Sequence, residues 1–252
     1  MAATRSRPVA VVTGASSGIG AATVVALGRQ GFQIVAGARR LARVSSVVGD
    51  LGLALPLDVT DAASIDSFVA VVSKKFGRID VLVNNAGLAL GLNTIADARD
   101  EDWTEMWEVN VLGLMRMTRS SLPLLRKAKH AHIVNLGSIA GFETYKGGGG
   151  YTASKHAVRA MSRTLRLELN GEPIRVTEIA PGMVETEFST IRFRGDRKAA
   201  KAVYQGVKPL VAEDIADCIV FAVTRPPHVN LDEIVIRPVA QAAQWLVARS
   251  GK

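Results

Sequence analysis

The stretch Thr13-Gly14-Ala15-Ser16-Ser17-Gly18-Ile19-Gly20 decides the fold of this 252-residue chain. It follows the apolar run Val9–Val12, which favours a buried strand, and a helical pattern begins at about Ile19. Because glycine lacks a Cβ atom, such a loop can turn sharply and bring its backbone close to a phosphate. The free N–H groups at the start of the helix would bind that phosphate. A strand, a glycine loop and a helix in this order predict a dinucleotide-binding site.

Apolar runs alternate with amphipathic helical patterns along the rest of the chain. Seven runs predict strands covered on both faces: Val9–Val12, Gln33–Ala38, Leu53–Leu57, Val81–Val83, His132–Leu136, Arg175–Ile179 and Glu233–Ile236. Five stretches between them predict helices: Ile19–Arg29, Ala62–Lys75, Trp103–Leu125, Ala153–Leu169 and Glu213–Val223. This alternation predicts a single α/β domain over residues 1–252, a Rossmann-type doubly wound parallel sheet of about seven strands with helices on both faces. We expect the segment 182–204, which follows a strand end, to cover the substrate as a lid.

Composition and charge exclude several classes of protein. Hydrophobic residues make up 48% and charged residues 21%, as in globular rather than disordered chains. No apolar run reaches the roughly 18 residues of a membrane span, and the basic N-terminus lacks the apolar stretch of a signal peptide. A single cysteine, Cys218, excludes an intramolecular disulfide and indicates a reducing cytoplasm. The net charge of +8 is scattered, so we expect an anionic cofactor or substrate as the partner rather than nucleic acid or a membrane.

The glycine spacing Gly-x-x-x-Gly-x-Gly resembles that of the short-chain dehydrogenase/reductase family, and the rest of the family pattern follows in order. The matching residues are Asp58, Asn84-Asn85-Ala86-Gly87, Asn110, Ser138, Tyr151-x-x-x-Lys155 and Pro181-Gly182. The resemblance covers the whole chain and implies an oxidoreductase that transfers a hydride between an alcohol or carbonyl and a nicotinamide cofactor. The cofactor contacts expected are Gly14, Ser16, Ser17, Gly18, Ile19, Gly20, Arg39, Arg40, Asp58, Val59, Asn85, Ala86, Gly87, Tyr151, Lys155, Pro181, Gly182, Val184 and Thr186.

The end of the second predicted strand selects the cofactor. An acidic residue about 20 positions after the glycine loop would bind the ribose hydroxyl of NAD. The chain instead has Arg39 and Arg40 there, and a guanidinium can hold a 2′-phosphate with two hydrogen bonds. We therefore expect NADP, with Arg39 as the main phosphate ligand and Arg40 assisting; the alternative is an arginine pair that only faces water.

Tyr151 and Lys155 are four residues apart in a helical stretch, so their side chains share a face. The pKa of a free tyrosine is about 10, and a nearby ammonium group would lower it, so Tyr151 can exchange a proton with the substrate oxygen. Ser138, at a strand end, would hold the same oxygen. The resemblance implies that Lys155 also binds the nicotinamide ribose, and that Asn110 anchors a water that completes a proton relay. No catalytic metal is expected, because the four histidines have no zinc-like spacing.

The variable segments resemble the NADP-dependent 3-hydroxy acid dehydrogenase branch of the family. These segments are Gly87–Gly91, Phe188–Ser189, Arg192–Asp196, His228–Asn230 and Arg237–Val239. The branch oxidises 3-hydroxy acids and reduces semialdehydes. Two departures are the glycine run Gly147–Gly150, which suggests a mobile wall, and an apparent one-residue deletion after Pro181-Gly182. The alternatives are a reductase of bulkier aldehydes or ketones in secondary or lipid metabolism, and a non-catalytic NADPH-binding sensor.

The substrate carboxylate needs a cation beside Tyr151 and Ser138. We expect Arg192 to bind it, because Phe193 beside it could close over the site and a two-bond arginine–carboxylate pair fixes orientation. Arg194 would face solvent beside Asp196, and the alternative is that both arginines only solvate the loop. By resemblance, Thr186 contacts the nicotinamide carboxamide.

Two long helical stretches, Trp103–Leu125 and Ala153–Leu169, resemble helices that pair across subunits in tetramers of the family. We therefore expect a homotetramer, with a dimer as the alternative.

Overall fold

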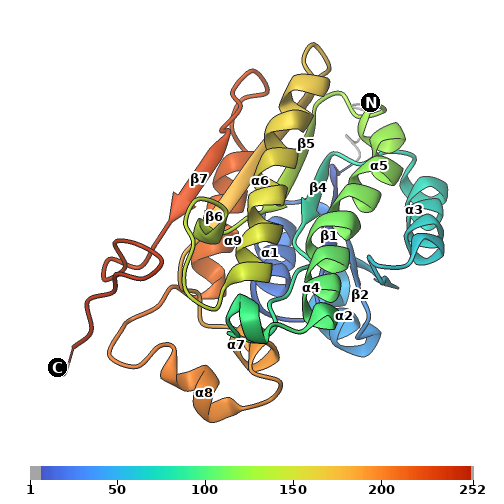
Figure 1. The fold of residues 1–252 in the computed structure, drawn as a ribbon. Coiled ribbons are helices and arrows are strands. Elements are labelled where there is room, and N and C mark those ends of the chain that lie inside the picture. Colours follow the sequence, from blue (N-terminus) through green and yellow to red (C-terminus); the bar gives the residue numbers. More distant parts are fainter. Residues whose placement is uncertain (1–6, 251–252) are drawn as a thin grey trace, which may run out of the picture.

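The computed structural model describes residues 7–250, in which one twisted sheet lies between two layers of helices (Figure 1). All strand pairs are parallel, in the order β3-β2-β1-β4-β5-β6-β7. The strands are β1 Val9–Thr13, β2 Gln33–Ala38, β3 Gly52–Pro56, β4 Val81–Asn84, β5 Ala131–Leu136, β6 Ile174–Pro181 and β7 Glu233–Ile236. The predicted doubly wound sheet is therefore confirmed, and each strand lies where the apolar runs placed it.

The two faces of the sheet carry separate apolar cores. One face packs against α3 Ala62–Phe76, α4 Asp100–Trp107, α5 Leu114–Leu125 and α6 Gly149–Glu168. The other face packs against α1 Gly18–Arg29, α2 Leu41–Val48 and α9 Ala212–Val223. Successive residues of β1 serve opposite cores, with Val11 in the first and Val12 in the second. This double burial explains why the strands read as continuous apolar runs rather than as alternating ones.

The predicted helix Trp103–Leu125 is divided in the structure. Between α4 and α5 the backbone forms a π-helical turn, η3 Glu108–Gly113. Gly113 at its end packs closely against the loop after β3, because a Cβ atom there would lie 2.8 Å from Val59 Cγ2. The turn lets the helix layer approach the loop after β3 at that point. A single amphipathic pattern continues through it, so periodicity alone predicts one helix.

Other helices differ from the expected ones in extent or number. α6 begins at Gly149, four residues before the expected start, and α2 was not predicted at all. The segment after β6 contains two short helices, α7 Glu187–Arg192 and α8 Arg197–Ala202. The remaining short turns are η1 Gly49–Leu51, η2 Ile95–Asp97 and η4 Ile139–Gly141.

None of the helices within residues 7–250 has both the length and the apolar character needed to cross a membrane. The N-terminal residues 1–6, on which the signal-peptide expectation was based, lie outside the described residues. Cys218 lies on α9 and is partly exposed, so it is not the fully buried core residue that its small apolar character favours.

The strand order reverses between β1 and β4, because the chain moves from β1 to β2 and β3 on one side and continues from β4 on the other. In doubly wound sheets, ligands bind beyond the carboxyl ends of the strands at such a reversal. The glycine loop follows β1, Asn85 follows β4, Ser138 follows β5 and Gly182 follows β6. The topology therefore gathers the predicted site residues at one edge of the sheet.

Candidate active site

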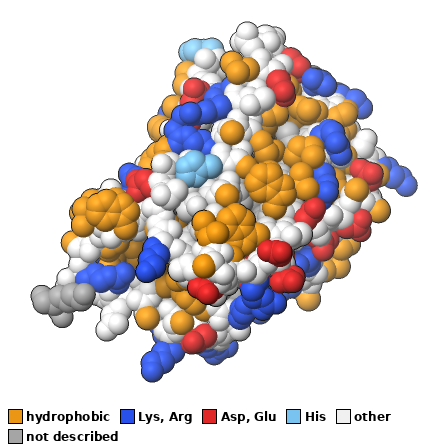
Figure 2. Space-filling model, viewed as in Figure 1, with side chains coloured by type: hydrophobic (Ala, Val, Ile, Leu, Met, Phe, Trp, Pro, Cys, Tyr) orange, Lys and Arg blue, Asp and Glu red, His pale blue; other side chains and the backbone are white. Residues whose placement is uncertain are grey.

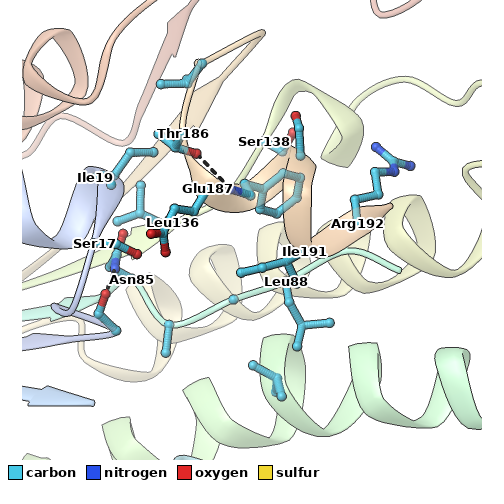
Figure 3. A pocket seen from close by; sticks show the side chains of 18 of the residues that line it. Ser17, Ile19, Asn85, Leu88, Leu136, Ser138, Thr186, Glu187, Ile191 and Arg192 are labelled. Carbon is cyan, nitrogen blue, oxygen red and sulfur yellow. Dashed lines mark hydrogen bonds between the residues drawn. The ribbon is translucent and has the colours of Figure 1, made fainter. Parts of the chain in front are cut away.

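A cleft of about 500 Å³ opens at this edge of the sheet. Its volume is within the range of small-molecule and cofactor sites. Figure 3 shows Ser17, Ile19 and Asn85 toward one end, and Ser138 and Arg192 toward the other. The predicted site residues that line it are Gly14, Ser16, Ser17, Gly18, Ile19, Arg39, Arg40, Asp58, Val59, Asn85, Ala86, Gly87, Ser138, Tyr151, Lys155, Pro181, Gly182, Val184, Thr186 and Arg192. Gly20 and Asn110 are the two predicted residues that lie outside this lining.

The glycine loop is held by close backbone packing. Gly14 has a φ of +65°, and a Cβ atom there would lie 2.8 Å from Ala86 Cα. Gly20 lies behind the loop, where a Cβ atom would come 2.5 Å from the Gly14 carbonyl oxygen. Asn85 Nδ2 donates to the carbonyls of Thr13, at 2.9 Å, and Gly14, at 3.1 Å. Glycine is therefore required for packing at positions 14 and 20.

The start of α1 keeps its donors free of side-chain caps. Ser17 is the N-cap residue, but its hydroxyl makes no capping hydrogen bond to the helix. The first N–H groups of a helix lack partners within the helix, and they attract anions. The hydroxyls of Ser16 and Ser17 instead accept hydrogen bonds from Arg40 Nη2, at 3.0 and 2.8 Å. Helix donors, hydroxyls and a guanidinium group thus converge at this end of the cleft.

Arg39 and Arg40 occupy different places in the cleft. Arg40 joins the serines of the glycine loop to Glu187 on α7. Arg39 interacts electrostatically with Asp58. Burial opposes ionisation of Asp58, but hydrogen bonds from Thr60 to its Oδ1 atom, from the backbone N at 3.0 Å and from Oγ1 at 2.7 Å, hold its pKa below the usual value. Both arginines line the cleft, so a 2′-phosphate there would meet two positive charges.

Ser138, Tyr151 and Lys155 lie together at the other end of the cleft. Tyr151 is in the first turn of α6 and hydrogen-bonds with the Ser138 side chain. Ser138 Oγ also accepts from Ala140 N at 3.1 Å, which orients it at the start of η4. Lys155 Nζ lies 5.9 Å from the centroid of the Tyr151 ring and donates to the Leu136 carbonyl at 2.7 Å. The structure thus brings a hydroxyl, a phenol and an amine to one place, as the sequence predicted.

The charge states of this trio depart from the expectation. Burial raises the pKa of Tyr151 to about 12, while the hydrogen bond with Ser138 acts in the opposite direction. Burial likewise lowers the pKa of Lys155 to about 8, against the attraction of Glu178. In the protein alone, therefore, desolvation outweighs any effect of the ammonium group on the phenol. Burial of both side chains thus shifts the pKa of Tyr151 in the direction opposite to that expected from the ammonium group.

Asn110 lies outside the cleft lining and links two segments that border it. Its side chain lies in η3, accepts from Leu88 N at 2.8 Å, and donates to Leu88 O at 2.8 Å and Ser154 Oγ at 3.0 Å. These bonds tie the loop after β4 to the helix that carries Tyr151. The Asn110 side chain therefore connects Leu88 to α6, and its expected part in a proton relay stays a prediction.

Arg192 reaches the catalytic end from the last turn of α7. Its Nη2 donates to the Tyr145 hydroxyl, and its Nε donates to Gly91 O at 3.2 Å. Its guanidinium carbon lies 5.6 Å from the centroid of the Tyr151 ring. Arg194 is half exposed, as predicted, but its ion-pair partner is Asp102 on α4 rather than Asp196. Asp196 instead caps α8 by accepting from Lys198 N, so it is occupied locally.

Residues of the segment 182–204 line the cleft, and the structure shows contacts among them that sequence patterns did not reveal. Phe188 packs edge-on against Tyr151, with ring centroids 5.6 Å apart. The Tyr204 hydroxyl hydrogen-bonds with Ser189 Oγ at 2.6 Å and donates to Val184 O at 2.9 Å, which ties the ends of the segment together. Thr186 lines the cleft and caps α7 by accepting from Phe188 N at 3.2 Å (Figure 3). Among these residues Tyr204 was not predicted, because its aromatic character in the sequence does not reveal what it contacts.

The glycine run before Tyr151 packs tightly. A Cβ atom at Gly147 would lie 2.3 Å from Leu92 O, and one at Gly150 would lie 2.5 Å from Met106 Cε. Gly148 is equally close to the Tyr145 ring. The run is therefore closely packed rather than the mobile wall that its composition suggested. Glycine at these positions leaves space for the neighbouring backbone and rings.

Within the described part of the chain, no group of three or more His, Cys, Asp or Glu side chains could hold a metal ion. His132 is buried, and its Nε2 lies 2.7 Å from Thr177 Oγ1, so it belongs to the core.

Comparison with known proteins places this geometry in context. A family model described as short chain dehydrogenase matches residues 8–196. An uncharacterised oxidoreductase of Mycobacterium tuberculosis is 56% identical over 241 residues, covering 95% of this chain and 94% of the relative. The NADP-dependent 3-hydroxy acid dehydrogenase of Schizosaccharomyces pombe is 41% identical, covering 92% of each chain. A solved closed form of serine dehydrogenase complexed with NADP+ has a TM-score of 0.90 and 39% identity, covering 96% of this chain and 99% of that one.

Proposed function

The chain belongs to the short chain dehydrogenase family, and on that premise we propose that it is an NADP-dependent oxidoreductase whose Ser138, Tyr151 and Lys155 act on 3-hydroxy acids or their semialdehydes. The observation that carries the proposal is the position of Arg192. A guanidinium group 5.6 Å from the Tyr151 ring stands where a substrate with its hydroxyl at Tyr151 would extend a carboxylate. The relative and the solved structure named for 3-hydroxy acids and for serine agree with this substrate class.

The far end of the cleft fits the cofactor. The uncapped start of α1 and the Ser16 and Ser17 hydroxyls suit a pyrophosphate, and the two arginines suit a 2′-phosphate. Lys155 and Thr186 also line the cleft, where they would bind the nicotinamide ribose and carboxamide. When bound, NADP supplies or accepts the hydride.

The protein's own part in the reaction is to hold the oxygen and exchange its proton. The Tyr151 hydroxyl donates a proton to a carbonyl oxygen in reduction, and its phenolate form accepts one from an alcohol in oxidation. Ser138 donates a hydrogen bond to the same oxygen, which stabilises the negative charge that develops there. Lys155 favours the phenolate form of Tyr151 once the cleft holds its ligands. Phe188 excludes water from the Tyr151 ring by packing against it.

Three further parts of the proposal rest on the surroundings of the cleft. We propose residues 1–252 as a single domain with 182–204 as its lid, since that segment carries Thr186, Phe188 and Arg192.

We propose a homotetramer because Trp103 and Trp107 are 37% and 45% exposed, and Figure 2 shows apolar side chains gathered over α4, α5 and α6. The single cysteine supports a reducing, cytoplasmic location. Light scattering tests the assembly, and the mass of one chain would contradict it.

A substrate panel tests the function. Serine, allo-threonine and other 3-hydroxy acids would be offered with NADP+, and semialdehydes and bulkier ketones with NADPH, while the absorbance of the reduced nicotinamide is followed. We expect the highest kcat/KM for the acids and semialdehydes. Preference for bulky ketones would indicate the alternative reductase, and NADPH binding without turnover of any compound would indicate a sensor.

A further inference from the structure

A carboxyl group that the proposed reaction does not use lies beside the catalytic lysine. Glu178 is in the centre of β6 and is 0% exposed. Neither of its carboxyl oxygens has a hydrogen-bond partner among the described residues. Burying an ionisable group without such partners is strongly unfavourable. We therefore expect a nearby charged group to stabilise the Glu178 carboxylate.

The neighbouring strands explain how the carboxyl group fits. Glu178 is in register with Asn135 on β5 and with Glu233 on β7. Gly137 leaves the space for it, because a Cβ atom there would lie 2.1 Å from Glu178 Oε1. Gly137 directly precedes Ser138 and donates from its N atom to Ile179 O at 2.8 Å. The carboxyl group therefore packs against the backbone that presents Ser138.

Four charged groups face Glu178 from the elements packed against it. Lys155, Arg159 and Arg166 come from α6, and Glu233 comes from β7. Arg159 Nη2 pairs with Glu233 Oε2 at 3.0 Å, and Arg166 Nη1 donates to the carbonyl oxygens of Val176 and Asp232. Lys155, by contrast, donates to the Leu136 carbonyl at 2.7 Å and forms no ion pair with the described residues.

We propose that Glu178 is a positioning residue whose carboxylate is the counter-charge of Lys155 and keeps its buried ammonium group protonated. The proposal rests on the proposed catalytic role of Lys155. Loss of the counter-charge would leave a buried amine that loses its proton more readily, and the favourable effect of Lys155 on Tyr151 would be lost with it.

Glu178 and Lys155 are both mostly charged only within a narrow range of pH. Burial lowers the pKa of Lys155 to about 8, and Glu178 opposes this change. Burial and Glu233 raise the pKa of Glu178 to about 7, while Arg159, Lys155 and Arg166 oppose it. Between these values Glu178 is mostly ionised and Lys155 is mostly protonated, so both partners are charged close to neutral pH.

The direct test measures the protonation of Lys155 in the full-length protein without cofactor. Protein labelled with 13C-lysine is titrated by NMR, and the Lys155 Cε signal is assigned by its absence in Lys155→Arg. In Glu178→Gln the pKa of Lys155 should fall by about one unit, the lower end of the effect of a neighbouring opposite charge. Glu178→Met, of similar volume and without charge, gives a second measurement should the glutamine variant not fold. An unchanged pKa of Lys155 in either folded variant would overturn the proposal.

Glu233→Gln is the matched control, because it removes a carboxylate from the same cluster. It should lower Tm through loss of the pairs with Arg159 and Arg163. It should not lower the pKa of Lys155, since Glu178 then ionises more readily.

Activity gives a second readout that separates this proposal from the proposed function. In Glu178→Gln, the fall of kcat at high pH should begin about one unit lower than in the wild type, whereas Glu178→Asp should retain most of the wild-type profile. If Tyr151→Phe is as active as the wild type, the proposed function fails. If Tyr151→Phe is inactive and the Glu178→Gln profile is unshifted, only the counter-charge proposal fails.

Discussion

Arg40 Nη1 lies 2.9 Å from Glu187 Oε2, so a side chain that follows β2 pairs with the first residue of α7, 147 positions later. The other oxygen of Glu187 accepts from Arg43 Nη1 at 2.8 Å. The Arg40 and Glu187 side chains are 43% and 45% exposed, so water screens the pair and its contribution to stability is small. The position of the pair matters more than its stability, because the Glu187 carboxylate pairs with the same guanidinium group that we propose for the cofactor phosphate.

Glu187→Gln should strengthen NADP+ binding. Removal of the carboxylate frees Arg40 and Arg43 for the 2′-phosphate, and an exposed pair of this kind predicts a roughly two- to five-fold lower Kd. Binding of NAD+, which lacks this phosphate, should change little. Titration of the two cofactors measures the effect. Weaker NADP+ binding in the variant would show instead that the pair holds the segment 182–204 closed over the cofactor.

Arg39→Ala should lower kcat/KM for NADPH by roughly ten-fold or more, since hydrogen bonds to charged groups contribute about 1.5–3 kcal/mol. Arg40→Ala should have a smaller effect, because Arg39 is the expected main ligand. Neither variant should alter the use of NADH much. Steady-state kinetics with both cofactors provide the comparison, and a wild-type preference for NADH would contradict the choice of NADP.

Tyr151→Phe should reduce kcat by roughly 10²–10⁴, because the variant cannot supply the proton to the substrate oxygen. Cofactor affinity should remain close to that of the wild type, since the ring and its contact with Phe188 are kept. A turnover assay measures kcat, and a cofactor titration measures the affinity separately. Turnover near the wild-type rate would remove Tyr151 from the chemistry.

Arg192→Ala should raise KM for acid substrates by tens-fold and leave turnover of neutral aldehydes nearly unchanged, because it removes a charged hydrogen-bond donor. Tyr145→Phe is the matched control: it deletes the hydroxyl that accepts from Arg192 but keeps the guanidinium group. This control should change KM much less. Equal effects of Arg192→Ala on acids and neutral aldehydes would show that Arg192 does not bind the carboxylate.

His132 should make the fold sensitive to acid. Burial, with a smaller effect of Arg175, lowers the pKa of His132 from 6.5 to about 3. Below pH 6.5 the unfolded chain binds a proton that the folded chain does not, so stability falls as pH decreases toward 3. Between pH 7 and 5 this one group should reduce the free energy of unfolding by about 2 kcal/mol. Urea unfolding at both pH values measures it. A folded His132→Gln variant should lose correspondingly less, and an equal loss would assign the acid sensitivity to other groups.

The parts of this fold that local patterns determine could be predicted from the sequence. The strands were found because each is buried on both faces, and the glycine loop because its conformation and contacts exclude side chains. The helix α2 was missed because it is short and Arg40, its N-cap residue, makes no capping hydrogen bond. The division at η3 was missed because one amphipathic pattern runs through it, and the close packing of Gly113 against Val59 joins segments that are distant in the sequence.

The site shows the same division between local and distant information. Spacing along α6 placed Tyr151 and Lys155 together, and strand ends placed Ser138 beside them. No local pattern could show that Arg194 pairs with Asp102 or that Arg40 pairs with Glu187, since each pair joins distant segments. The charge states of Tyr151 and Lys155 could not be predicted from residue spacing either, because burial changes their pKa more than the neighbouring side chains do.

The glycine run Gly147–Gly150 directs where this enzyme can be redesigned. Any side chain at Gly147 would collide with the Leu92 backbone, and the four glycines are not part of the cleft lining, so libraries that vary them would disturb packing without enlarging the cleft. Ile191, Val203 and Tyr204 line the cleft from the segment after β6 and belong to its short helices and connecting turns. Randomising Ile191 and Val203, with the glycines and the hydrogen-bonded Tyr204 left unchanged, should allow new substrate preferences to be selected while the fold is kept.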